Sequence, residues 1–277
     1  MTQEYVLESY LKQLRLPGML HAYQSLAAEA ARANLTYEQF LLGLLREEIK
    51  SRQVSRIQRA TQAARFPVLK DLADFDWSYV PSVPKARILE LAQGTYIDQH
   101  EPIVLIGNPG LGKSHVASGL ALAACRQGRK VRFYNVAGLI NDLIKAQQEY
   151  QLSRVMATIC KQELIVLDEL GFLPFTREGA QLLFQVCSAL YERVAVIVTT
   201  NLRFAEWSSI MGGDERMSAA LLDRLTHRAT ILEFVGTSFR FRQQLQKNPH
   251  RQEEQDLPAP PDEETHQEGK EEDSSSA

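Results

Sequence analysis

The sequence of 277 residues predicts an α/β fold, in which a parallel sheet is covered by helices on both faces and preceded by a small all-helical domain. Two observations lead to this prediction. Short apolar runs rich in β-branched residues alternate with amphipathic segments of helical length, as in a sheet that is buried on both faces. The first 65 residues instead carry apolar residues at helical spacing. We expect a helical domain over 1–66, an α/β domain over 67–247 with a connector over 67–100, and an acidic tail over 248–277.

Three helices are expected before the connector. The first ends where a Pro-Gly pair at 17–18 breaks its helical spacing, and the second runs over 21–33. The third begins at Thr36, whose hydroxyl can cap the helix while Gln39 reaches back to form a capping box. Pro67 ends it, because proline cannot continue a helix.

One face of this third helix changes character along its length. It is apolar near Leu41 and basic further on, where Arg52, Arg56 and Arg59 share the same face. Either the helix breaks near Ser51, or its second half leaves the small domain and meets an anionic partner. A solvated helix end, with arginines near the negative pole of the helix dipole, explains the pattern equally well.

The apolar runs place five strands and two short helices in the rest of the chain. The strands are expected over 101–107, 130–135, 163–168, 194–200 and 230–235, and the short helices over 85–93 and 238–246. From residue 248 onward the chain is too polar to pack, so we expect it to be disordered.

The formal net charge of −3 hides an uneven distribution of charge. The last 30 residues carry ten acidic and two basic side chains, whereas residues 1–247 carry 29 basic and 24 acidic ones. The folded part is therefore mildly basic, and the charge of the whole chain does not exclude a nucleic acid as partner.

Several classes of protein are excluded by composition. No apolar run approaches the roughly 20 residues of a membrane-spanning helix, and the first residues do not resemble a secretory signal. The three cysteines lie far apart and without CxxC spacing, which is typical of reduced thiols rather than of disulfides or a zinc site. We expect a cytoplasmic protein without a membrane partner.

A phosphate-binding loop follows the first expected strand and precedes a helix. Residues 107–114, GNPGLGKS, match the pattern GxxxxGK[ST], whose backbone amides surround a phosphate group. Lys113 can reach the β- and γ-phosphates, and the Ser114 hydroxyl can ligate Mg²⁺. The expected nucleotide contacts are Gly107, Asn108, Pro109, Gly110, Leu111, Gly112, Lys113, Ser114 and His115.

Polar residues end two further strands. Asp168 can accept a hydrogen bond from a water on Mg²⁺, and Glu169 can polarise an attacking water. Asn201 follows the next strand and can hold that water if the two strands are neighbours. Each could instead be an ordinary polar residue at the start of a loop or turn. The adjacent Asp-Glu pair favours hydrolysis over phosphoryl transfer to a small metabolite.

Together, these residues resemble the AAA+ ATPases, and more narrowly the IstB family of insertion-sequence transposition helpers, relatives of the DnaC helicase loader. The resemblance covers about residues 5–245 and rests on GNPGLGKSH, DELGFLPFTREGAQLLFQV, VIVTTNLRFAEW, ALLDRLTHRATILEF and SFRFR. The second of these runs is the most specific. The resemblance implies an initiator-type P-loop fold, ATP and Mg²⁺ as cofactors, and ATP hydrolysis.

The resemblance also implies a role for each matching residue. Lys113 and Ser114 would bind phosphate and magnesium, Asp168 and Glu169 would form the Walker B pair, with Asp168 on the metal, and Asn201 would be sensor 1. Arg224 matches the arginine finger and Arg240 matches sensor 2. Both assignments have competitors nearby in the sequence, namely Arg216, Arg228 and Arg242. An arginine finger acting between subunits contributes about 10³–10⁵ in rate, so hydrolysis should depend on assembly. Only one short helix stands where the wider superfamily has a helical lid.

The expected function is that of an ATP-dependent DNA-binding protein, which forms a homo-oligomer on duplex DNA and assists an IstA-like transposase. A second candidate within the class is a DnaC-like helicase loader acting on single-stranded DNA. Two functions of different classes are also compatible with the phosphate loop, namely a small-molecule P-loop kinase and a nucleotide-gated switch with negligible turnover.

DNA binding is implied by the resemblance and supported only modestly by the residues. The basic part of the third helix and the segment between the second and third strands, where initiator-type relatives place DNA-contacting helices, contain the candidates. These are Arg52, Arg56, Arg59, Lys145, Arg154 and Lys161. No helix-turn-helix, zinc finger or aromatic platform is evident, so binding should be largely independent of sequence. Solvated lysines on amphipathic helices would explain the same residues without DNA.

Overall fold

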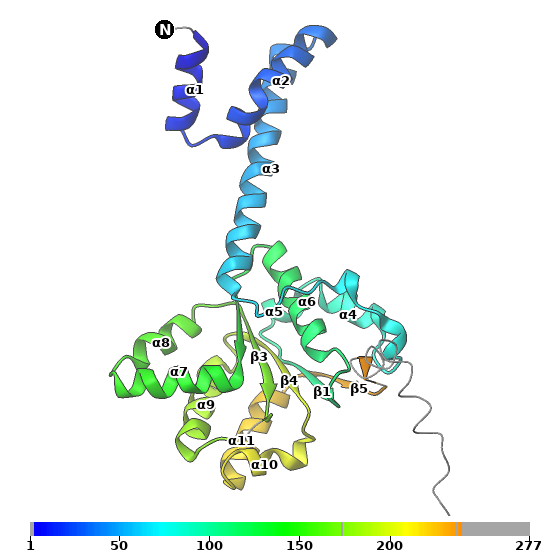
Figure 1. Ribbon diagram of the computed structural model, residues 1–277, viewed down its shortest axis with the longest axis vertical. Helices are drawn as coiled ribbons and strands as arrows, with labels where there is room; N and C mark the ends of the chain where they lie inside the picture. The colour runs from blue at the N-terminus through cyan, green and yellow to red at the C-terminus, as the bar shows by residue number, and fades with distance from the viewer. Residues whose placement is uncertain (1–2, 173, 237, 240–277) are drawn as a thin grey trace, which may run out of the picture. The chain divides into compact units, whose positions relative to one another are not determined.

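A computed structural model places five strands in one parallel sheet, in the order β2-β3-β4-β1-β5 (Figure 1). The strands are β1 Ile103–Gly107, β2 Val131–Asn135, β3 Leu164–Leu170, β4 Ala195–Thr200 and β5 Thr230–Phe234. The structure describes residues 3–172, 174–236 and 238–239. The expected sensor 2 residue Arg240, most of the short helix over 238–246 and the acidic tail over 248–277 lie outside these residues.

Helices cover both faces of the sheet, as predicted. They are α6 Lys113–Arg126, α7 Val136–Gln148, α8 Leu152–Ile159, α9 Arg177–Leu190, α10 Trp207–Ile210 and α11 Glu215–Thr226. In β3, Leu164 and Val166 pack in the cluster that contains α6, whereas Ile165 and Leu167 pack in the cluster that contains α7, α9 and α11. Alternate residues of one strand therefore belong to two cores, one on each face.

The connector folds against the α6 face of the sheet. It contains α4 Lys85–Leu91, α5 Thr95–Asp98 and two short 3₁₀ helices, Leu72–Asp74 and Trp77–Tyr79. Ile88 and Ile97 are fully buried in the same cluster as α6. A third 3₁₀ turn, Phe204–Glu206, follows β4. No helix in the described part of the chain has the length and apolar character of a membrane span.

Three helices precede the connector: α1 Gln3–Gln13, α2 Pro17–Ala33 and α3 Tyr37–Ala64. The predicted capping box at Thr36 and Gln39 is present. The predicted role of Pro17 was wrong, because this residue begins α2 rather than separating it from α1. Proline is tolerated at the first position of a helix, where its missing N–H is not needed.

α3 is continuous, so the break considered near Ser51 does not occur. Its second half contacts α6 and β2. Arg56 Nη2 donates to the carbonyl oxygen of Gly128 at 3.3 Å, and Arg132 Nη1 of β2 donates to that of Ala63 at 2.9 Å. Part of the basic face of α3 therefore contacts the protein itself.

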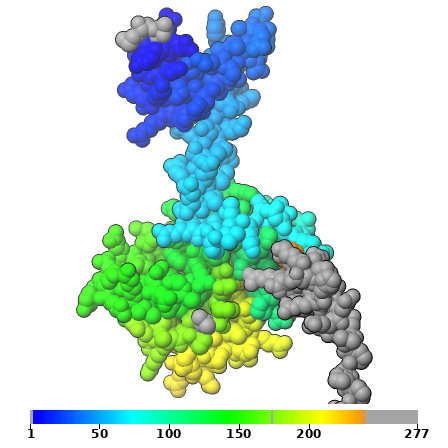
Figure 2. Space-filling view, in the orientation of Figure 1, coloured from blue at the N-terminus to red at the C-terminus, as the bar shows by residue number. Residues whose placement is uncertain are grey.

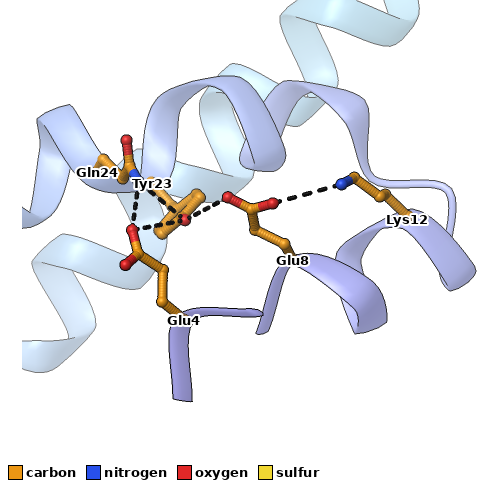
Figure 3. A network of polar contacts seen from close by, with 5 residues as sticks. All are labelled: Glu4, Glu8, Lys12, Tyr23 and Gln24. Carbon is orange, nitrogen blue, oxygen red and sulfur yellow. Dashed lines mark hydrogen bonds and ion pairs between the residues drawn. The ribbon is translucent and has the colours of Figure 1, made fainter. Parts of the chain in front are cut away.

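A buried carboxylate joins the N-terminal helices. Glu48 of α3 accepts hydrogen bonds from the backbone amides of Gly18 at 2.8 Å and Met19 at 3.2 Å, and from Arg52 Nε at 2.6 Å. Glu48 thus satisfies amides at the N-terminus of α2 that have no partner within their helix. A second network links α1 to α2 through Glu4, Glu8, Lys12, Tyr23 and Gln24 (Figure 3).

Candidate active site

The predicted site residues lie at or just after the carboxyl ends of three adjacent strands. β4 lies between β1 and β3 in the sheet, and all three run in the same direction (Figure 1). The phosphate loop, Asn201 and Asp168 therefore meet at the carboxyl edge, the edge where the strands end. Neighbouring strands lie about 4.8 Å apart, which puts the ends of β1 and β3 about 10 Å apart with Asn201 between them. The role predicted for Asn201 requires its strand to adjoin the strand of Asp168. The two strands, β4 and β3, are neighbours.

The phosphate loop depends on its glycines. Gly112 has a φ of +87°, and a Cβ there would collide with the ring of Phe75 from the connector. Lys113 begins α6 and is buried, with Nζ donating to the carbonyl oxygens of Gly107 at 2.6 Å and Asn108 at 2.8 Å. The ammonium group thus lies over the loop, beside the positively polarised start of α6, where a phosphate group would be favoured.

The two residues after Lys113 differ in their surroundings. Ser114 is half-buried in the first turn of α6. His115 Nε2 lies 2.7 Å from the carbonyl oxygen of Asp71, and its ring meets that of Phe75 edge-on at 5.1 Å between centroids. His115 therefore contacts the connector, and its predicted nucleotide contact stays a prediction.

The two carboxylates at the end of β3 have different surroundings. Asp168 is buried and accepts a hydrogen bond from Thr199 Oγ1 at 2.6 Å. Glu169 is exposed, and its carboxylate accepts a hydrogen bond from Asn135 Nδ2 at 2.8 Å. The Asp168 carboxylate is thus buried at the end of the sheet, whereas the Glu169 carboxylate is exposed, where a water could reach it.

Glu169 has an unusual backbone conformation, with a φ of +60°. The other seven non-glycine residues with positive φ in the described chain each lie just after the end of a helix, where this conformation is common. Glu169 is the exception, since it lies within a strand. Such strain is concentrated at functional sites, because the surrounding structure must maintain it.

The residues at this edge fit Mg²⁺ bound together with a nucleotide. Within the described residues, no group of three or more His, Cys, Asp or Glu side chains could hold a metal ion. Mg²⁺ at phosphate sites needs only one or two protein oxygens, because phosphate oxygens and water supply the rest. The Ser114 hydroxyl and the Asp168 carboxylate are oxygen ligands of the kind required.

Arg224, the predicted arginine finger, lies at the amino ends of the strands, opposite the carboxyl edge that carries the phosphate loop. Its Nη1 donates to the carbonyl oxygen of Ala220 at 2.6 Å, and its guanidinium lies 4.9 Å from the ring centroid of Phe184. It lines a small pocket with residues 99–102, which precede β1, and Val194, which precedes β4. The structure therefore places Arg224 away from the phosphate loop of its own chain.

Its two competitors are placed differently. Arg216 is exposed in the first turn of α11, and Arg228 pairs with Glu101 at 3.2 Å. The choice among the three arginines stays a prediction.

The predicted DNA-binding residues lie on separate elements. Arg52 and Arg56 already contact Glu48 and Gly128, and Arg59 Nε donates to the carbonyl oxygen of Ser55 in its own helix. Lys145 of α7 lies 3.9 Å from Glu149. Arg154 and Lys161 are exposed on α8 and in the turn after it. In the space-filling view α7 and α8 form one continuous surface (Figure 2).

Two residues of the site were not singled out from the sequence. Asn135 ends β2 and holds Glu169, and Thr199 of β4 holds Asp168. Asn135 could have been found by applying to the second strand the rule that identified Asn201, since each polar residue ends an apolar run. Nothing in the sequence distinguishes Thr199 from Thr200.

Comparison with known proteins supports this interpretation. A family model described as "IstB-like ATP binding protein" matches residues 9–247. The chain belongs to this family. It is 35% identical over 237 residues to a protein named as ATP-binding in insertion sequence IS5376 of Geobacillus stearothermophilus, covering 86% of this chain and 94% of that protein. It is also 35% identical to the corresponding IS21 protein of Pseudomonas aeruginosa, covering 86% and 89%. The resemblance predicted from the motifs is confirmed.

Solved structures share the fold of this IstB-like chain. The crystal structure of DnaI has a TM-score of 0.51 at 16% identity, covering 60% of this chain and 91% of that one. The replication initiator DnaA, bound to AMPPCP and single-stranded DNA, also has a TM-score of 0.51 at 16% identity, covering 66% and 56%. At such identities the likeness shows the fold alone, and the predicted AAA+ P-loop fold is confirmed.

Proposed function

We propose that this protein hydrolyses ATP with Mg²⁺ as cofactor, assembles on duplex DNA when ATP is bound, and assists the transposase of an insertion sequence. The observation that carries the proposal is the meeting of the phosphate loop, the Asp168–Glu169 pair and Asn201 at three adjacent strand ends. The names of its relatives, ATP-binding proteins of insertion sequences, support the biological setting.

Each residue has a part in this reaction. The amides of the loop and Lys113 bind the phosphates, while Ser114 and Asp168 would hold Mg²⁺, which stabilises charge on the phosphate oxygens. Glu169 accepts the proton of a water that Asn201 orients. The water oxygen bonds to the γ-phosphorus, the bond from that phosphorus to the bridging oxygen breaks, and ADP and phosphate are released.

Arg224 would complete the site of a neighbouring subunit. Within one chain it lies where the strands begin, whereas the phosphate loop lies where they end. A contribution from Arg224 therefore requires a second copy, and hydrolysis should rise with assembly.

Contact with DNA would come from exposed cations. Arg59, Arg154 and Lys161 are exposed and belong to no ion pair within the described residues. Cations that neutralise phosphates give binding that weakens with salt and depends little on sequence.

Electron microscopy of the protein with duplex DNA, with and without ATP, tests the proposal. We expect ordered assemblies with ATP for the wild type and for Lys85→Ala, a control at an exposed residue without a proposed role. Lys113→Ala should form none. ATP-independent assemblies of Lys113→Ala would contradict the proposal, and a preference for single-stranded DNA would favour helicase loading instead.

A further inference from the structure

The end of β3 contains a β-bulge that includes both carboxylates of the proposed site, Asp168 and Glu169. Leu167 pairs with Val198 of β4, and Leu170 pairs with Thr200. Two residues of β3, Asp168 and Glu169, therefore lie opposite a single residue of β4, Thr199. This count of two residues against one defines a bulge, which disrupts the hydrogen-bond ladder and redirects side chains.

The Thr199 hydroxyl contacts both residues of the bulge. It accepts a hydrogen bond from the backbone amide of Glu169 at 2.9 Å and donates one to Asp168 Oδ1 at 2.6 Å. Thr199 is only 1% exposed, so water does not compete for these bonds. A side-chain oxygen thus satisfies an amide that the bulge removes from regular pairing.

The bulge is also held from its other side. Asn135 of β2, which pairs with Asp168 in the sheet, donates from Nδ2 to Glu169 Oε2 at 2.8 Å. Asn135 contacts the carboxylate of Glu169, whereas Thr199 contacts its backbone. The left-handed conformation of Glu169 is therefore supported from both neighbouring strands.

We propose that Thr199 is a positioning residue for both carboxylates. Its hydroxyl maintains the bulge that directs Glu169 outward, and it fixes the orientation of the Asp168 carboxylate, which would hold Mg²⁺. This inference rests on the proposed ATPase function. Without the hydroxyl, the Glu169 amide lacks a partner unless β3 shifts toward regular pairing with β4, and that shift would move the Glu169 side chain.

Variants at residue 199 test this role. Thr199→Val has nearly the same shape without the hydroxyl, and Thr199→Ser keeps the hydroxyl. Thr230→Val is the matched control, because Thr230 begins β5 in the same sheet and its hydroxyl contacts Arg87. Three quantities are measured. They are kcat and KM for ATP hydrolysis, and the Mg²⁺ concentration that gives half of the maximal increase in the binding of fluorescent ATP.

For Thr199→Val we expect kcat to fall at least tenfold, KM to change less than threefold, and the required Mg²⁺ concentration to rise several-fold. Thr199→Ser and Thr230→Val should stay within threefold of the wild type in all three quantities. If Thr199→Val does not fold, Thr199→Cys, which keeps the size but hydrogen-bonds weakly, should show the same losses in milder form.

Wild-type values for the valine variant, or equal losses for Thr199→Val and Thr199→Ser, would overturn the inference. The Mg²⁺ measurement separates this failure from failure of the proposed function. If the wild type binds ATP but does not hydrolyse it, the proposed function fails. In that case, the Mg²⁺ dependence of ATP binding, compared between the wild type and Thr199→Val, still tests whether Thr199 positions Asp168.

Discussion

The sheet region and the N-terminal helices each contain a buried carboxylate, and the two are used differently. Glu48 joins α2 to α3 and accepts three hydrogen bonds from the protein. Asp168 lies at the carboxyl edge of the sheet and is held by a hydroxyl, that of Thr199. A carboxylate can accept about four hydrogen bonds. Glu48 is thus largely satisfied within its own fold, whereas Asp168 keeps acceptor capacity for a metal or water.

The surroundings of the two carboxylates differ as well. All of β4, six of the seven residues of β3 and the first three of β1 are buried, so apolar packing supports the ends of these strands. The apolar core of α1–α3 has only three buried residues in the described chain, Leu11, Met19 and Tyr23. Polar contacts must therefore contribute more to the N-terminal helices, and substitutions there should change stability without changing the nucleotide site.

The largest effect is expected at the sheet edge. Glu169→Gln should reduce ATP hydrolysis by about 10²–10⁴-fold, because the amide cannot accept the proton of the attacking water. Nucleotide affinity should stay within threefold, as measured by fluorescent ATP binding, and Glu178→Gln on the exposed first turn of α9 is the control. Unchanged hydrolysis would indicate a nucleotide-gated switch without catalysis by Glu169.

Removing the Glu48 carboxylate should lower the stability of the N-terminal helices and leave the nucleotide site unchanged. Glu48→Ala leaves the Gly18 and Met19 amides buried without a partner, at a cost of about 3 kcal/mol. Hydrogen exchange should show lost protection in α1 and α2, while ATP affinity is retained. Glu47→Ala is the control, because Glu47 makes only a long contact of 3.9 Å to Lys50 among the described ion pairs. Loss of ATP binding in Glu48→Ala would contradict the claim that the N-terminal helices and the nucleotide site respond independently.

A smaller loss is expected where α2 crosses α3. A Cβ at Gly18 would lie 2.6 Å from the Glu47 carbonyl oxygen and 2.6 Å from Glu48 Cα, so Gly18→Ala should cost about 2 kcal/mol through overpacking. At Gly43 a Cβ would meet only Leu26 methyl groups, at 3.7 Å or more. Gly43→Ala should therefore be neutral or stabilising in thermal unfolding. Equal effects of the two substitutions would contradict the close helix crossing.

The smallest effect is a dependence on pH. Burial alone would raise the pKa of Glu48, but hydrogen bonds from Arg52, Met19 and Gly18 outweigh it and hold the pKa below its ordinary value. The resulting stability is fully present above the unfolded pKa of about 4.3 and is lost as pH falls through the lower folded value. Protection of α2 amides should decrease below about pH 4.3 in the wild type more than in Glu48→Gln. Identical pH profiles would refute this contribution.

Features that depend on nearby residues could be predicted from the sequence. The five strands follow from their apolar runs, the capping box from Thr36 and Gln39, and the phosphate loop from a continuous pattern. Pro17 was misinterpreted because proline both breaks a helix and begins one, and which it does depends on the residues that pack around it.

Features that depend on distant pairing could not be predicted. The bulge at Glu169 exists only in the register of β3 against β4, so Thr199 looks like any other residue of an apolar strand. Glu48 lies in a charged stretch of α3, and its burial results from contact with Gly18, which is 30 residues away. Likewise, Arg56 on the basic face of α3 contacts the protein itself because Gly128, which follows α6, lies beside it.

The most direct test of a site shared between subunits is to mix two inactive variants. Glu169→Gln lacks the base but keeps Arg224, and Arg224→Ala lacks the proposed finger but keeps Glu169. We expect each alone to hydrolyse ATP very slowly with duplex DNA, and an equal mixture to recover a clear fraction of the wild-type rate. A mixture no more active than its separate components would contradict a site completed by Arg224 of a neighbouring subunit.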